Sequence, residues 1–134
     1  MIEAAHSFRV RYAETDRMGY VYYGNYAIYF EVGRVEALRK LGFSYKEMED
    51  QGILLPVINY TIKYIKPAYY DDLLTVNTKI NSVSGARIHF TYETYNEQNI
   101  LLNTAETTLV FMDAKSSRPC PVPNWFLEAL EKLS

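Results

Sequence analysis

Residues 25–42 read Asn-Tyr-Ala-Ile-Tyr-Phe-Glu-Val-Gly-Arg-Val-Glu-Ala-Leu-Arg-Lys-Leu-Gly, and they predict one long helix from Tyr26 to Leu41. Asn25 is a preferred N-cap residue, and Gly42 stands where a left-handed residue commonly ends a helix. The first half, Tyr26 to Phe30, is apolar nearly all round, which is typical of a helix buried on most sides. Other parts of the chain must therefore wrap this helix.

Segments with period-two alternation of apolar and polar residues flank the helix on both sides. The segment Ala5–Tyr12 precedes it, and four further strands are expected at about 58–64, 74–80, 88–92 and 100–112, with Ser82–Gly85 as a turn. A short helix from Ser44 to Gly52 and an amphipathic tail, Trp125 to Leu133, complete the pattern. An antiparallel sheet curled around one helix is the simplest two-layer solution, an α+β fold whose open strand edges favour dimerisation.

Composition narrows the function. The chain has 134 residues, of which 49% are hydrophobic and 22% charged, so we expect one globular domain over 1–134. The formal net charge is −2, which does not indicate nucleic-acid binding. Cys120 is the only cysteine, which excludes an internal disulfide and a cysteine-rich zinc site. No membrane-length apolar run and no secretory signal are present, so the expected location is the cytoplasm, without membrane association.

The chemistry is expected in the loop before the helix, where Asp16 precedes Gly19 and the helix start. A helix N-terminus carries free N–H donors and partial positive charge, which attract an anion or a developing oxyanion. A carboxylate beside that end can act as a base or a nucleophile on a bound carbonyl group. The structural alternative is that Asp16 is an Asx-turn residue that only shapes its own loop.

The loop also fills a longer pattern, Tyr-x-x-Thr-Asp-x-x-Gly-x-Val-x-x-x-x-Tyr, with Tyr12, Thr15, Asp16, Gly19, Val21 and Tyr26. Downstream stand the segments Tyr29-Phe30-Glu31, Tyr64-x-x-Pro67 and Asp71-Asp72-x-Leu74. Together these motifs resemble the hotdog-fold acyl-CoA thioesterases, the 4-hydroxybenzoyl-CoA thioesterase-like family, over most of the chain. The resemblance implies a five-stranded sheet around one helix, and an acyl-CoA thioester as substrate.

The resemblance also assigns roles. Asp16 matches the catalytic carboxylate, as general base or nucleophile, and Tyr23 matches the residue whose backbone N–H polarises the thioester carbonyl. The implied substrate-binding positions are Gly19, Val21, Gly24, Asn25 and Tyr26. No metal or cofactor is required, because a thioester carbonyl is reactive and thiolate leaves readily. The implied assembly is a homodimer, extended in some cases to a homotetramer, and the acyl group stays open.

Other polar residues carry weaker signals. His6 and His89 read as ordinary strand residues rather than metal ligands, with a CoA phosphate as an alternative for His89. Glu31 and Arg34, three apart on the helix, are expected to pair, with a second catalytic acid as the alternative role for Glu31. The candidate cations for the CoA phosphates are Lys63, Lys66, Arg87, Lys115 and Arg118. The tyrosines Tyr20, Tyr22 and Tyr29 line either an acyl tunnel or the core, and core is the preferred interpretation.

Two other functions stay open. A hotdog protein that binds CoA esters or a protein partner without turnover would have no need of Asp16. A hydratase or dehydratase of the same fold typically pairs an acid with a histidine, and the loop from Ala13 to Asn25 contains no histidine. The chain also lacks the Gly-x-Gly-x-x-Gly and Gly-x-Ser-x-Gly patterns of dinucleotide-binding proteins and serine hydrolases.

Overall fold

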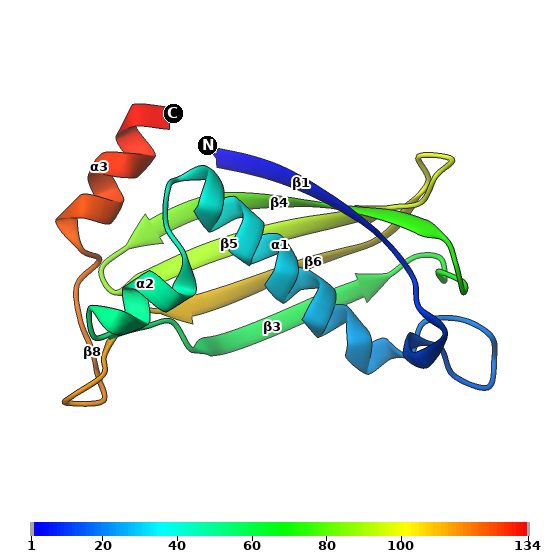
Figure 1. Cartoon of the computed structure of the whole chain (residues 1–134), viewed down its shortest axis with the longest axis horizontal. Coiled ribbons are helices and arrows are strands. Elements are labelled where there is room, and N and C mark those ends of the chain that lie inside the picture. The colour runs from blue at the N-terminus through cyan, green and yellow to red at the C-terminus, as the bar shows by residue number, and fades with distance from the viewer. Residues whose placement is uncertain (1, 134) are drawn as a thin grey trace.

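Helix α1 (Tyr26–Lys40) lies across one face of an antiparallel sheet in the computed structural model, which describes residues 2–133 (Figure 1). The five strands follow the order β1-β4-β5-β6-β3. Their bounds are β1 (Ile2–Arg9), β4 (Leu73–Ser84), β5 (Arg87–Tyr95), β6 (Leu101–Val110) and β3 (Val57–Tyr64). The predicted α+β class, a five-stranded antiparallel sheet around one long helix, is confirmed.

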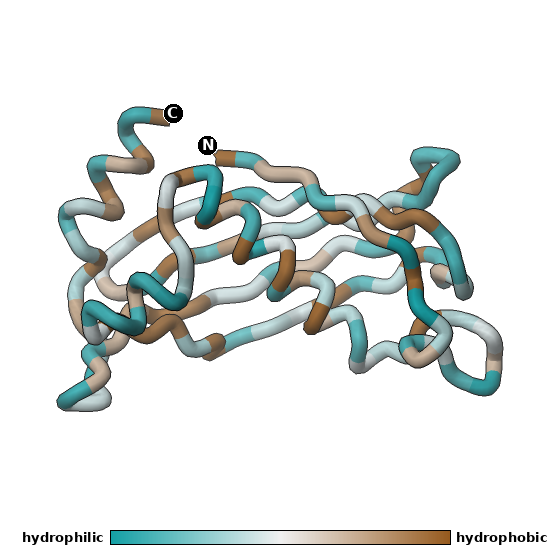
Figure 2. The backbone as a smooth tube through the Cα atoms, viewed as in Figure 1, coloured by the Kyte–Doolittle hydropathy of each residue, from teal (hydrophilic) through white to brown (hydrophobic). Residues whose placement is uncertain are grey.

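The core forms between α1 and the sheet, because alternate strand residues point toward the helix. On β5 these are Ile88, Phe90 and Tyr92, all almost fully buried, and the Tyr92 ring centroid lies 4.7 Å from that of Phe30 on α1. Figure 2 shows hydrophobic residues recurring along α1 and the strands, whereas the loops at both ends are mostly hydrophilic. Burial of this apolar face holds the helix on the sheet.

The remaining elements close the two ends of the sheet. Helix α2 (Tyr45–Asp50) starts as predicted, with the Ser44 hydroxyl accepting from the Glu47 N–H at 3.1 Å. A small sheet that the sequence did not predict joins β2 (Ile53–Leu54), β7 (Met112–Asp113) and β8 (Arg118–Pro119). Helix α3 (Asn124–Leu133) packs its buried Phe126 on Phe111, at the end of the sheet opposite the Asp16 loop (Figure 1).

Several strand boundaries differ from the prediction: the strand expected at 88–92 extends to Tyr95, and the one expected at 100–112 ends at Val110. The first strand covers Ile2–Arg9 and not Ala5–Tyr12, because the backbone of Val10 pairs with Asp71 and Asp72 and the chain then turns. Strand β4 continues to Ser84 instead of turning at Ser82, since a register shift after Ile80 keeps it paired with β5. The turn follows at Gly85, which has φ +62°.

The helix start also corrects the prediction. Asn25 does not cap α1 with its side chain; its amide Nδ2 donates instead to the Glu14 carbonyl oxygen at 2.8 Å. The first half of α1 is not buried on most sides either, since Ile28 is 54% exposed while Tyr26 and Phe30 are buried. The predicted helix end is confirmed, with Gly42 at φ +93° just beyond it.

Strand β3 differs from the central strands in its exposure. Every residue of β3 except Ile62 is exposed, including Val57, Ile58 and Tyr60, whereas β4 and β5 mostly alternate between buried and partly covered positions. Strand β3 is one of the two sheet edges, so one row of its backbone groups has no neighbouring strand.

Between residues 2 and 133, no helix is long and apolar enough to cross a membrane.

Candidate active site

The loop between β1 and α1 folds back on itself and carries most of the predicted site. Two short 3₁₀ turns, η1 (Tyr12–Glu14) and η2 (Tyr23–Asn25), bracket it. Between them, Thr15 pairs with Val21 as an antiparallel bridge, and the Asp16 N–H donates to the Tyr20 carbonyl at 3.0 Å. Gly19 makes the reversal with φ +87°, a conformation that favours glycine.

The Asp16 carboxylate has one engaged oxygen and one available oxygen. Its Oδ1 accepts from the Met18 N–H at 2.9 Å, which is the Asx turn of the structural interpretation. Among residues 2–133, no donor reaches its Oδ2. The side chain is partly exposed and lines a hollow of about 410 Å³. Asp16 therefore shapes its loop and still presents a free carboxylate oxygen.

The hollow brings together residues from three segments of the chain. Its walls are formed by Asp16, Met18, Tyr20, Val21, Tyr23 and Tyr26 from the loop and helix start, by Tyr64 at the end of β3, and by Ile65, Lys66 and Pro67, which follow that strand. Four predicted site residues, Asp16, Val21, Tyr23 and Tyr26, thus share one cavity. Gly19, Gly24 and Asn25 flank it without lining it. The contribution of β3 was missed as a site, although Tyr64-x-x-Pro67 was part of the recognised pattern.

Tyr23 lines this hollow at the start of a short helical turn. It opens η2, and the first N–H groups of a helical turn have no acceptor within the turn. Helix α1 follows directly, so its partial positive charge lies at the same end. The phenol ring of Tyr23 is 66% exposed and leans on Tyr22, with ring centroids 4.7 Å apart. The N–H of Tyr23, at the start of this turn, is therefore the candidate donor to a bound carbonyl group.

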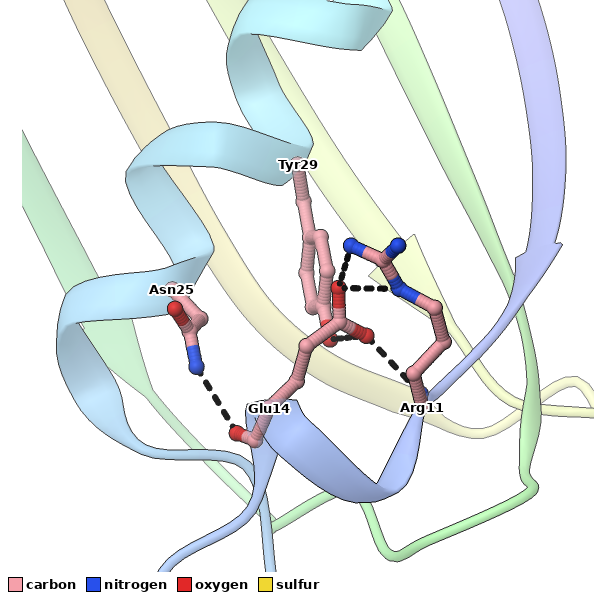
Figure 3. A network of polar contacts seen from close by, with 4 residues as sticks. All are labelled: Arg11, Glu14, Asn25 and Tyr29. Carbon is pink, nitrogen blue, oxygen red and sulfur yellow. Dashed lines mark hydrogen bonds and ion pairs between the residues drawn. The ribbon is translucent and has the colours of Figure 1, made fainter.

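A buried carboxylate that the sequence analysis missed ties this loop together (Figure 3). The Glu14 carboxylate accepts from the Arg11 N–H at 2.8 Å, from its guanidinium at 2.8 and 3.1 Å, and from the Tyr29 hydroxyl at 3.0 Å. The Glu14 carbonyl oxygen accepts from the Tyr22 N–H and from Asn25 Nδ2. Glu14 thus joins the start of the Asp16 loop to the start of α1. The sequence signal that could have indicated this contact is the spacing of three residues between Arg11 and Glu14.

Burial and hydrogen bonding set the protonation of this network. Burial raises the pKa of the Glu14 carboxyl, but hydrogen bonds from Arg11 and Tyr29 outweigh it, so the pKa lies below its ordinary value. Burial and the Glu14 charge raise the pKa of the Tyr29 hydroxyl, which stays a donor. Burial also raises the pKa of Tyr26 to about 12. All three groups hold one protonation state near neutrality.

The remaining candidates lie elsewhere. His6 stacks near Phe8 on β1, with ring centroids 6.0 Å apart, and His89 lies 3.5 Å from the Glu106 carboxylate on the sheet. Of the five cations, Lys66 lines the hollow, whereas Arg118 lies in β8 at the far end of the molecule (Figure 1). Within residues 2–133, no group of three His, Cys, Asp or Glu side chains is placed to hold a metal ion.

The tyrosine and arginine expectations are partly wrong. Tyr29 is core, as predicted, but Tyr22 is 46% exposed and Tyr20 lines the hollow. Arg34 does not pair with Glu31. Its guanidinium turns inward and donates to the hydroxyl groups of Tyr45 at 3.3 Å and Tyr92 at 3.1 Å.

Comparison with known proteins places this geometry in a family. A family model of the thioesterase-like superfamily matches residues 10–130. The chain belongs to the thioesterase-like superfamily. It is 38% identical over 120 residues to a putative acyl-CoA thioesterase of Bacillus subtilis, covering 87% of each chain. It is 36% identical over 115 residues to an acyl-CoA thioester hydrolase of Escherichia coli, covering 86% of each.

A solved structure extends the agreement to the fold. The DHNA-CoA thioesterase of Staphylococcus aureus superposes with a TM-score of 0.92 and 39% identity, over 99% of this chain and 91% of that one. The hotdog fold implied by the sequence pattern is therefore confirmed. This thioesterase-like protein is a thioester hydrolase, as its family and relatives show.

Proposed function

We propose that the protein hydrolyses the thioester of an acyl-CoA, with Asp16 as general base or nucleophile and the Tyr23 N–H as the carbonyl donor. The observation that carries this proposal is that Asp16 and Tyr23 line one hollow, which is large enough for a small acyl group. The carboxylate keeps one oxygen without a donor in the described chain. The N–H belongs to a turn that leads directly into α1.

In the general-base route, Asp16 takes a proton from water while the water oxygen bonds to the thioester carbon. The carbonyl electrons move to oxygen, and the Tyr23 N–H together with the helix end stabilises that charge. The C–S bond then breaks, and the CoA thiolate takes the proton back from Asp16. In the nucleophilic route, Asp16 bonds to the carbonyl carbon and expels the thiolate, and water hydrolyses the resulting anhydride.

Lys66 is the proposed contact for a CoA phosphate. It lies at the exposed rim of the hollow, beside Ile65 and Pro67, so its ammonium group can reach solvent while the acyl group is held deeper. The aromatic lining, with Tyr20, Tyr26 and Tyr64, is suited to an aryl acyl group, because rings pack well on rings. The S. aureus neighbour is named a DHNA-CoA thioesterase, which points the same way.

We also propose that two copies pair through the β3 edge into one continuous sheet. This would cover Val57, Ile58 and Tyr60, which are 37–49% exposed in one chain. The unit that pairs is one domain spanning 1–134, and its proposed setting is the cytoplasm, where the free Cys120 stays reduced. Analytical ultracentrifugation distinguishes the dimer from the tetramer by mass.

The second candidate is a protein that binds CoA esters without turnover, favoured by the engagement of Asp16 in its own Asx turn. The experiment that separates the two is thiol release from a panel of short-chain, long-chain and aryl acyl-CoAs. The enzyme releases CoA from at least one of them and the panel ranks the acyl groups. A binder shows affinity without release, and a hydratase consumes enoyl-CoA without free thiol.

A further inference from the structure

Arg34 is a buried cation whose hydrogen-bond partners among residues 2–133 are uncharged. It is 7% exposed, and its Nε and Nη1 donate to the hydroxyl groups of Tyr45 and Tyr92. The Tyr92 hydroxyl lies 2.6 Å from the Thr107 hydroxyl. Throughout residues 2–133, no carboxylate lies within 4.0 Å of the Arg34 guanidinium, so Arg34 has no ion pair there. A guanidinium cannot lose its proton in a protein, so its charge stays.

A buried charge without a counter-ion is unfavourable, and the molecule leaves room for one. Arg34 lines a hollow of about 290 Å³ between α1 and β3, together with Phe30, Tyr60 and Thr107. Burial works against the charge of Arg34, although the tyrosine contacts hold its pKa above the ordinary value. The hollow therefore suits a carboxylate that arrives from outside the chain.

Glu31 lines the same hollow and is exposed. It stands three residues before Arg34 on α1, yet the structure pairs Arg34 with tyrosines instead. Nothing among the described residues forms an ion pair with Glu31. One helix thus presents an inward cation and an outward anion, and neither has an oppositely charged partner in the described part of the chain.

We propose that the counter-ion of Arg34 is Glu31 of a second copy of this chain, so that each dimer holds two reciprocal Arg34–Glu31 pairs. A two-fold interface requires one surface to carry both halves of every contact, and α1 carries the cation and the carboxylate within one turn. Around the hollow, Ile28, Val57 and Ile58 are each about half exposed, which a second copy would cover. This inference rests on the proposed β3 dimer.

Subunit exchange between two single variants tests the pairing. In an Arg34→Met chain the cation is lost and Glu31 is kept; in a Glu31→Gln chain the reverse holds. Neither variant holds both partners, but their mixed dimer restores one pair between chains. Native mass spectrometry of an equimolar mixture is expected to show the mixed dimer favoured about tenfold in the exchange equilibrium. The matched control is a mixture of Glu36→Gln chains with Arg34→Met chains. Glu36 is a carboxylate on the same helix that already pairs with Arg39 at 2.8 Å, so it is not the proposed partner of Arg34.

A statistical mixture in both experiments would overturn the pairing. If the wild-type chain sediments as a monomer at micromolar concentration, the dimer proposal itself is wrong. If it sediments as a dimer and the exchange is statistical, only the Arg34–Glu31 pairing is wrong. A thermal shift with benzoate that disappears in Arg34→Met, together with statistical exchange, would assign the hollow to a free carboxylate and reject the second copy. Thiol release is measured separately, so failure of the catalytic proposal is distinguishable.

Discussion

The Tyr29 hydroxyl donates to the Glu14 carboxylate at 3.0 Å, and this buried hydrogen bond joins helix α1 to the loop that carries Asp16. Glu14 is 9% exposed and receives further hydrogen bonds from Arg11. Asp16 stands two residues after Glu14. The Glu14 carbonyl oxygen also accepts from the N–H of Tyr22, the residue just before Tyr23. The geometry of the site therefore depends on residues that do not line it.

Replacing Tyr29 with Phe removes this one hydrogen bond and keeps the ring. Because the acceptor is charged, we expect the free energy of unfolding to fall by about 1.5–3 kcal/mol. Urea denaturation measures it, with Tyr69→Phe as the control, since the Tyr69 side chain is 51% exposed and should change stability by less than about 0.5 kcal/mol. Equal effects from the two variants would contradict the structural importance of the Glu14 contact.

The Glu14 carboxylate also predicts a pH dependence. Its pKa is lower in the folded protein than in the unfolded chain, despite burial, because of the Arg11 and Tyr29 hydrogen bonds. Its contribution is therefore present above the unfolded pKa of about 4.3 and is lost as the pH falls through the folded pKa. The stability difference between wild type and Glu14→Gln should shrink from pH 7 toward about pH 3. A difference independent of pH would refute this sign.

Gly33 lets α1 approach β4 closely. A Cβ at this position would collide with the Thr78 hydroxyl and come within 3.3 Å of Val76 Cγ1. Gly33→Ala should cost about 1–3 kcal/mol by overpacking, although alanine usually improves a helix by about 1 kcal/mol. In the double variant with Thr78→Ala, the two losses should not add. Additive losses in thermal or urea unfolding would show that Thr78 is not the obstacle.

Thr94 and Asn103 face each other across β5 and β6, fully buried and without hydrogen-bond partners for their side chains among the described residues. Thr94→Val keeps the shape and removes an unsatisfied hydroxyl, so we expect stability to rise by about 1 kcal/mol. Thr108→Val, on the partly exposed face of β6, is the control and should change little. A loss of stability in Thr94→Val would mean that its hydroxyl is satisfied in solution.

The sequence predicted the elements with strong periodicity and clear caps. The helix from Tyr26, its end before Gly42 and the Ser44 cap are local features, which depend on neighbouring residues alone. The strand ends were less predictable, because the end of β1 depends on pairing between Val10 and Asp72, which are far apart in the chain. The small sheet of β2, β7 and β8 depends on similar distant pairing.

For the site, the loop residues were predictable from one continuous pattern, and the structure places Asp16, Val21, Tyr23 and Tyr26 around one hollow. The other wall comes from β3, and no spacing rule connects it with the loop. Asn25 was misread because its local preference for capping lost to a tertiary contact with Glu14. Arg34 was misread for the same reason, since two distant tyrosines compete with the nearby glutamate.

The proposed role of Tyr23 predicts that kcat is insensitive to the loss of its side-chain hydroxyl. Because the proposed donor is its backbone N–H, Tyr23→Phe should keep kcat within about threefold of wild type. The phenol is exposed, so its loss should also change the free energy of unfolding by less than about 0.5 kcal/mol. Steady-state kinetics on the best acyl-CoA of the panel gives the comparison, and a loss of kcat as large as that expected for an Asp16 variant would assign the chemistry to the hydroxyl instead.

The most direct measurement of catalysis by Asp16 is the kcat of Asp16→Asn beside wild type on that same acyl-CoA. The substitution keeps an acceptor oxygen for the Met18 N–H, so the Asx turn and the melting temperature should survive. We predict a loss in kcat of about 100-fold or more with little change in KM, as expected for a lost base or nucleophile. A variant that folds and releases CoA at the wild-type rate would contradict a catalytic Asp16.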